Sequence, residues 1–157
     1  MPNWCEGTLK VRGTKADIKR WAKEALQPNG ASSTPQENIL KWNDDETEAI
    51  VQELCWIEGS RRGFVQAGSE INFWEYEDVD EDEPVIVIVD AEFAWCCDSP
   101  TLADSSKKYG VDYYFYGFER GMEFEQLVEI HNGTVIQDKV INYKDYAWES
   151  INPMLGG

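Results

Sequence analysis

Residues 85–110, VIVIVDAEFAWCCDSPTLADSSKKYG, decide the fold that this sequence predicts. Val85 to Trp95 is an apolar run rich in β-branched and aromatic residues, which is typical of a buried strand. Ser99 as N-cap, Pro100 at the first helical position and Gly110 after the last turn then bracket a helix. The inward side of that helix is expected to carry Leu102, Ala103, Ser106 and Tyr109.

The segments on either side extend this pattern. Residues 4–12 alternate as a strand, and a helix over 15–26 follows it, with Thr14 as its N-cap. Downstream, three strands are predicted in VDYYFYGFE, EFEQLVEIH and TVIQDKVINY. The Asn132-Gly133 pair between the last two is typical of a tight hairpin turn, because both residues tolerate positive φ.

The middle of the chain is the least regular part. TEAIVQELCWIEG, residues 47–59, favours a short helix, because Ile50 and Leu54 recur at helical spacing. The run LCWI within it would also suit a strand. Residues 62–77 are expected to be extended, so the acidic stretch that follows becomes a hairpin connection to the strand at Val85.

This order of elements predicts a fold class. Strand, helix, strand, strand, helix, strand is the order of a ferredoxin-like split β-α-β core, in which two helices cover one face of an antiparallel sheet. We therefore predict one α+β domain over residues 1–157, with an irregular acidic insertion at about 27–84. The C-terminal β-hairpin is expected to widen the sheet.

The net charge of −16 is concentrated in that insertion and just after it. Residues 27–98 carry 18 acidic and 3 basic side chains, and EYEDVDEDEP, residues 75–84, has seven carboxylates. Such a surface repels DNA and anionic membranes and attracts basic proteins. We therefore expect a basic host protein as partner, without direct binding to nucleic acid or membrane; the oligomeric state is left open.

The residues predicted to bind that partner are carboxylates and two aromatic anchors. They are Glu75, Glu77, Asp78, Asp80, Glu81, Asp82, Glu83, Asp44, Asp45, Glu46, Trp74 and Tyr76. Charge would steer the encounter and the aromatic side chains would fix the interface. The simpler alternative is a solvated loop that keeps an aromatic-rich strand pair soluble.

Catalytic and metal-binding patterns are sparse. Asp78, Asp80 and Asp82 match the first three ligand positions of an EF-hand calcium loop. The sixth position, however, is Glu83 instead of Gly, and the twelfth is Val89 instead of Glu. The four cysteines lack paired zinc spacing. Glu129 and His131 fall on one face of a strand and are candidates for a pair. We predict no catalytic residue, no metal and no cofactor, and, from the absence of a leader pattern, a cytoplasmic protein.

Three motifs resemble the YubB-type ferredoxin-like domain family of phages, plasmids and their hosts. They are Met1-Pro2-Asn3-Trp4-Cys5, FAWCCDSP at 93–100, and Tyr-x-x-Glu-x-Gly-x-x-Phe from Tyr116 to Phe124. The similarity covers about the first 26 residues and about 85–143, and it departs from the family at Asp98-Ser99-Pro100, where a double proline is usual. It implies a fold and a mobile-element origin, without an established activity.

The sequence thus favours a non-enzymatic, acidic binding protein that docks on a basic host protein. One form of such a protein is a nucleic-acid mimic that inhibits a defence or nucleic-acid-handling enzyme. The alternative is a small enzyme or a ligand- or metal-binding domain, with its site near Cys96, Cys97 and the C-terminal hairpin.

Overall fold

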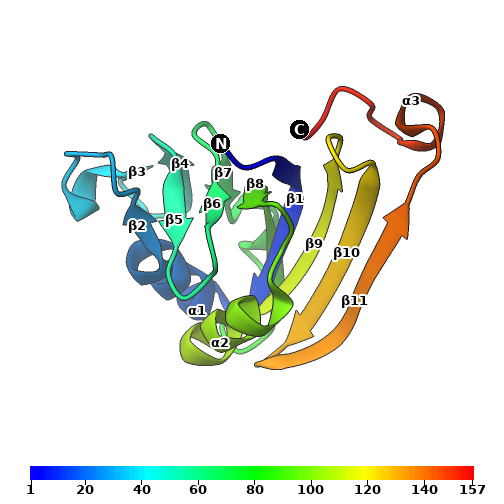
Figure 1. The fold of residues 1–157 in the computed structure, drawn as a ribbon. Coiled ribbons are helices and arrows are strands. Elements are labelled where there is room, and N and C mark those ends of the chain that lie inside the picture. Colours follow the sequence, from blue (N-terminus) through cyan, green and yellow to red (C-terminus); the bar gives the residue numbers. More distant parts are fainter.

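The structure, a computed structural model, describes residues 1–157 and consists mainly of antiparallel strands (Figure 1). The long strands are β1 (Trp4–Gly13), β8 (Val85–Ala94), β9 (Asp112–Glu119), β10 (Phe124–His131) and β11 (Thr134–Asn142). The short strands are β2 (Leu26–Pro28), β3 (Leu40–Trp42), β4 (Glu48–Val51), β5 (Cys55–Ile57), β6 (Gly63–Val65) and β7 (Glu70–Asn72).

The helices are short. They are α1 (Lys15–Arg20), which continues as a π-helical turn η1 (Trp21–Ala25), then α2 (Ser99–Tyr109) and α3 (Tyr146–Glu149). Two single turns of 3₁₀ helix, η2 (Gln36–Asn38) and η3 (Trp74–Tyr76), lie in the connections.

The strands form two sheets. The larger sheet has 8 strands in the order β11-β10-β9-β1-β8-β6-β5-β2, and the smaller has 3 in the order β3-β4-β7. β1 lies at the centre of the larger sheet, where it pairs over its whole length with β8 on one side and over residues 6–12 with β9 on the other. At Gly7 these backbones are so close that a Cβ would collide with the carbonyl oxygen of Tyr116, so this position requires glycine.

The ferredoxin-like prediction is wrong. The chain is mostly antiparallel sheet with three short helices, instead of a sheet under two substantial helices. The cause is the segment 27–84, which we expected to be irregular: β3, β4 and β7 build a second sheet, and β5 and β6 extend the first. The helix predicted in 47–59 is absent, because Glu48–Val51 and Cys55–Ile57 are strands.

The acidic stretch is also not a hairpin connection. β7, which precedes it, pairs with β4 in the small sheet, whereas β8, which follows it, pairs with β1 and β6 in the large sheet. Residues 73–84 therefore link two different sheets. This placement brings the acidic segment next to α1 as well as to the first half of β8.

The first strand, the second helix and the last four long strands are confirmed close to their predicted bounds. The helix predicted over 15–26 is α-helical only to Arg20, and the segment 62–77 is extended only in β6 and β7. Thr14 caps α1, since its Oγ1 accepts a hydrogen bond from the backbone amide of Asp17. Gly110 ends α2 at a φ of 66°, and Asn132 and Gly133 both have positive φ in the β10–β11 turn. The first residue of α2 is Ser99, so Asp98 instead of Ser99 holds the N-cap position.

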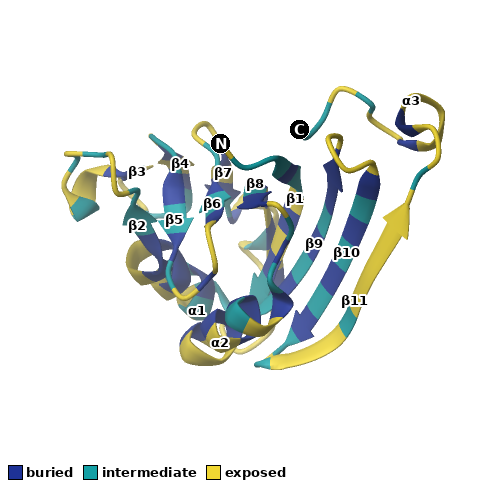
Figure 2. Ribbon diagram, viewed as in Figure 1, coloured by how far each residue is buried: buried dark blue, intermediate teal, exposed yellow.

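The core lies on one face of the large sheet, under the helices, and includes buried residues of the small sheet such as Val51 and Ile71. Leu9, Val11 and Val87 on the sheet pack in one buried cluster with Trp21 and Leu102 from the helices. Within that core, the indole Nε1 of Trp21 donates a 2.7 Å hydrogen bond to the Tyr113 hydroxyl. The opposite face of β1 and β8 is open and carries half-buried and exposed side chains (Figure 2).

Candidate protein-binding surface

The acidic segment 75–83 presents all of its carboxylates to solvent. The exposed residues are Glu75, Glu77, Asp78, Asp80, Glu81, Asp82 and Glu83. Val79 is half-buried and packs against the core, so the segment rests on the protein and directs its acidic side chains outward.

Lys15 on α1 holds the backbone of this segment. Its Nζ donates hydrogen bonds of 2.9 Å to the carbonyl oxygen of Tyr76 and 3.0 Å to that of Val79. It also lies 3.6 Å from the carboxylate of Glu81, and its side chain is only 13% exposed. The Tyr76 hydroxyl in turn donates to the carbonyl oxygen of Ile86 at 2.9 Å. These contacts therefore fix the first half of the acidic segment, at Tyr76 and Val79.

The second predicted acidic group, residues 44–46, lies beside this segment. A 2.9 Å hydrogen bond from the Phe73 amide to the Thr47 carbonyl oxygen joins the β3–β4 turn to it. Asp44 and Asp45 are exposed. Glu46 forms a 2.8 Å ion pair with Lys23, whose hydrogen bond and charge lower the pKa of that carboxyl group.

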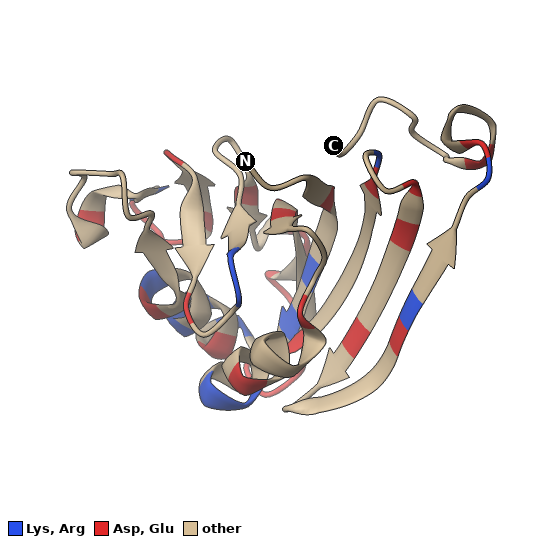
Figure 3. Cartoon of the chain, in the orientation of Figure 1, with Lys and Arg blue, Asp and Glu red and all other residues tan.

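The carboxylates do not form one isolated patch. Figure 3 shows Asp and Glu also on β10, on β11 and near α3. Lysines of α1 and η1 neutralise part of the two acidic segments through the contacts with Glu46 and Glu81. The excess is therefore spread over the molecule, and its densest part is 75–83.

A groove of about 530 Å³ adjoins the acidic segment. Trp74, 53% exposed, and Ile88, 55% exposed, supply large apolar side chains to it, and Tyr76 and Ile86 also line it. The only charged lining residues are three carboxylates, and the groove contains no Lys or Arg. These acidic residues are Glu70, Glu75 and Asp90. A groove that combines large apolar side chains with carboxylates is complementary to a cationic protein surface.

Sequence reasoning found only part of this groove. It identified Trp74, Tyr76 and Glu75, but it missed Ile86, Ile88 and Asp90. The apolar run from Val85 to Trp95 predicts a strand that is buried on both faces. In the structure, β8 instead alternates strictly from Val85 to Asp90 between buried and exposed positions. That period-two pattern would have placed all three on the open face.

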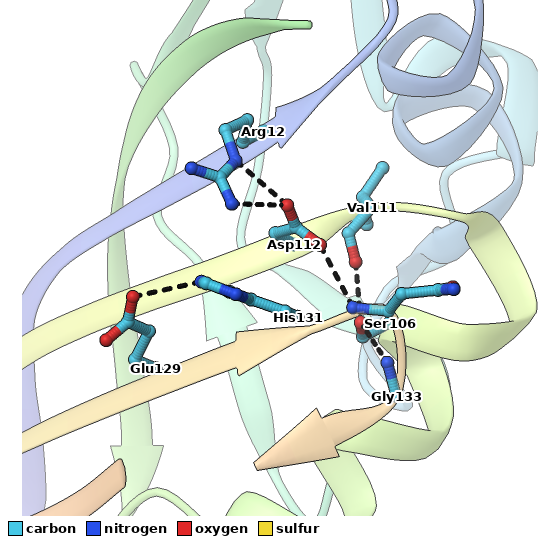
Figure 4. A network of polar contacts seen from close by, with 8 residues as sticks. Arg12, Ser106, Val111, Asp112, Glu129, His131 and Gly133 are labelled. Carbon is cyan, nitrogen blue, oxygen red and sulfur yellow. Dashed lines mark hydrogen bonds and ion pairs between the residues drawn. The ribbon is translucent and has the colours of Figure 1, made fainter. Parts of the chain in front are cut away.

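A second polar site lies farther along the open face (Figure 4). Arg12 donates to Asp112 through Nε and Nη2 at 2.8 and 2.7 Å, and Asp112 also accepts from the Asn132 amide. The predicted pair of Glu129 and His131 is present at 2.9 Å. These side chains line a hollow of about 260 Å³, together with Lys10 and Tyr114.

A third groove, of about 540 Å³, lies at Cys96 and Cys97, where the alternative site was predicted. The Cys97 amide donates to buried Gln126, whose side chain also reaches Asp138 at 3.0 Å. Burial raises the pKa of the Cys96 thiol and, more strongly, that of Cys97, which makes both poor nucleophiles at neutral pH. Nowhere does the structure bring together three or more His, Cys, Asp or Glu in a geometry suited to a metal ion.

Comparison of the chain with models of protein families, with curated proteins and with solved structures finds no match. The resemblance to the YubB-type family therefore stays a prediction. No helix of the structure has the length and apolar character that crossing a bilayer requires.

Proposed function

We propose that this protein binds a basic partner protein through the groove at Trp74 and the acidic segment beside it. The observation that carries the proposal is the composition of the groove: exposed Trp74, Ile86 and Ile88 line it together with three carboxylates. Lys10 and Arg12, across the β1–β8 ladder from Ile88 and Ile86, line the neighbouring hollow instead. Soluble monomers rarely expose several large apolar side chains together unless the surface binds something.

The two parts of this surface have different roles. Exposed carboxylates at 75–83 raise the rate at which a cationic protein arrives, because their attraction extends over about a Debye length, ~8 Å at physiological salt. Once the partner is in contact, burial of Trp74 is expected to make the largest contribution of any single side chain, since tryptophan is enriched among interface hot spots. The groove therefore predicts fast, salt-dependent association followed by salt-independent anchoring.

The hydrogen bonds from Lys15 preorganise the acidic segment for binding. They fix the carbonyl oxygens of Tyr76 and Val79, so little backbone freedom remains to be lost on binding. A loop that only improves solubility has no need of such a contact.

Within this class we propose a nucleic-acid-binding host protein as the partner. Such proteins carry clustered Lys and Arg that neutralise phosphates, and the same side chains would pair with the acidic segment. The resemblance to phage and plasmid proteins that the sequence predicts is our reason to propose a defence or nucleic-acid-handling enzyme in this role. The protein would then compete with nucleic acid for the partner's basic surface.

The test begins with capture of host proteins and continues with purified components. After the partner is identified, association and dissociation rates are measured for the wild type, for Trp74→Ala and for the triple variant Asp78→Asn, Asp80→Asn, Asp82→Asn. The triple variant should associate more slowly and lose salt dependence. Trp74→Ala should dissociate faster and weaken binding roughly thirty-fold, which corresponds to about 2 kcal/mol.

Matched controls separate this surface from the total charge. The triple variant Glu24→Gln, Asp104→Asn, Glu123→Gln removes the same number of exposed carboxylates elsewhere, and Trp148→Ala removes a tryptophan that is 87% exposed. Both controls should bind like the wild type. Equal losses in test and control variants, or no loss at Trp74, would contradict the proposal.

A further inference from the structure

The hollow of about 260 Å³ on the open face is built from the side chains of four neighbouring strands, β8, β1, β9 and β10. Lys10 and Arg12 reach it from alternate positions of β1, since residues two apart share one face of a strand. Tyr114 on β9 lies directly across from Lys10, and Ile86 on β8 lies across from Arg12. The hollow therefore places two cations beside two apolar side chains on a paired sheet, which fixes their relative positions.

Both carboxylates of the hollow are already paired within the protein (Figure 4). One oxygen of Asp112 accepts from Arg12, and the other accepts from a backbone amide of the β10–β11 turn at 2.9 Å. The oxygens of Glu129 bond to the imidazole of His131 at 2.9 Å and to the side-chain amide of Gln137 at 2.8 Å. Every carboxylate oxygen in the hollow thus has a partner, so a cation would have to displace an existing contact.

The cations, in contrast, keep unused donors. Lys10 forms no ion pair within the chain, and its Nζ lies 5.8 Å from the centre of the Tyr114 ring. Arg12 contacts Asp112 through Nε and Nη2, which leaves its Nη1 free. Because the acceptors are paired and the strongest donors are not, a ligand that completes this site must supply acceptors. Carboxylate and phosphate groups are the acceptors that ammonium and guanidinium groups bind most strongly.

We propose that this hollow binds a small organic anion, with its carboxylate or phosphate group on Lys10 and Arg12 and its apolar part against Ile86 and Tyr114. Ligand sites combine apolar walls with a few polar groups in this way, and the volume of the hollow suits only a small molecule. Its two cations balance its two carboxylates, so the hollow does not share the chain's net charge of −16. The inference is independent of the proposed function, because none of the carboxylates of the groove at Trp74 lines this hollow.

His131 supplies the readout, because it is the only histidine of the chain and its NMR signals need no further assignment. The probes are benzoate and phenyl phosphate, titrated at fixed pH and ionic strength, with benzamide as an uncharged control of the same shape as benzoate. At least one anion should shift the His131 signals to saturation, and the tighter of the two identifies the preferred head group. Benzamide should leave the signals in place. No saturable shift with either anion, or an equal shift with benzamide, would overturn the inference.

A lysine substitution tests whether the free donors hold the anion. Lys10→Gln removes an ammonium group without an ion-pair partner, so the variant should stay folded, which circular dichroism verifies. It should weaken binding of the tighter probe about ten-fold, the usual effect of losing one charged hydrogen bond. Lys139→Gln is the control, since Lys139 also forms no ion pair but does not line the hollow, and it should bind the probe like the wild type. Unchanged binding by Lys10→Gln, or equal weakening in both variants, would contradict the proposal.

Discussion

The ionised side chain of Glu92 on β8 destabilises the folded state. It lies directly across from Glu6 on β1, and it is half-buried. Burial, and to a lesser degree the charge of Glu6, raise the pKa of the Glu92 carboxyl group, against a hydrogen bond from Gln66 at 3.2 Å. Because the folded pKa exceeds the unfolded one, the stability contributed by the protonated group is lost as the pH rises through the folded pKa.

Glu92→Gln should therefore increase the free energy of unfolding at pH 7. The variant removes a half-buried charge and, to a lesser degree, its repulsion by Glu6, which together are worth a few tenths to about 1 kcal/mol. The gain should disappear when the pH is lowered below the carboxyl pKa values, because the wild-type residue is then neutral as well. Denaturant unfolding at both pH values measures this difference, with exposed Glu123→Gln as the control. A gain of the same size at both pH values would show that charge is not its cause.

At the scale of elements, the connection between β7 and β8 depends on a residue of α1. Lys15 and Lys19 both face it, but only Lys15 donates hydrogen bonds to its carbonyl groups. Lys19 lies over the Phe73 ring at 5.6 Å instead. Substitution of Lys15 removes these hydrogen bonds, whereas substitution of Lys19 removes the same charge and leaves them in place.

Lys15→Met should lower the free energy of unfolding by about 1–3 kcal/mol, the usual effect of losing hydrogen bonds from a charged group. Hydrogen exchange should become faster at the amides of Val79 and Glu83, which bond within the segment. Lys19→Met should leave those amides unchanged. Exchange that speeds up equally in both variants would mean that charge, instead of the hydrogen bonds from Lys15, orders the segment.

The sequence predicted the long elements and failed on the short ones for a physical reason. β8–β11 and α2 show several periods of their patterns, and Asn132-Gly133 and Gly110 mark their ends. Strands of three or four residues contain too few periods to tell a strand from a helix, as at Ile50 and Leu54. What selects them is pairing between distant segments, such as β2 with β5 and β6 with β8.

The candidate surface was likewise predicted only where its residues lie close together in the sequence. Local composition identified Trp74 and the acidic run, because both lie within one short segment. The groove itself needed Ile86, Ile88 and Glu70 from neighbouring strands of two sheets, and only the fold brings these residues together. The pair of Glu129 and His131 was predictable, since two residues on one strand share a face regardless of the rest of the fold.

For the whole molecule, the groove at Trp74 and the β11 edge both expose apolar side chains but differ in charge. The groove at Trp74 combines apolar side chains with an acidic rim, whereas β11 is apolar and nearly neutral. The two lie at different places on the large sheet, one beside the start of β8 and the other at the far edge (Figure 1).

The central claim is that the groove at Trp74 contacts the partner. The most direct measurement is the NMR spectrum of the indole N–H groups of the seven tryptophans, each assigned by substitution, with and without the purified partner. The Trp74 signal should shift or broaden most, while those of buried Trp21 and of exposed Trp95 and Trp148 stay in place. An unchanged Trp74 signal, with the largest shift at Trp95 or Trp148, would contradict the account.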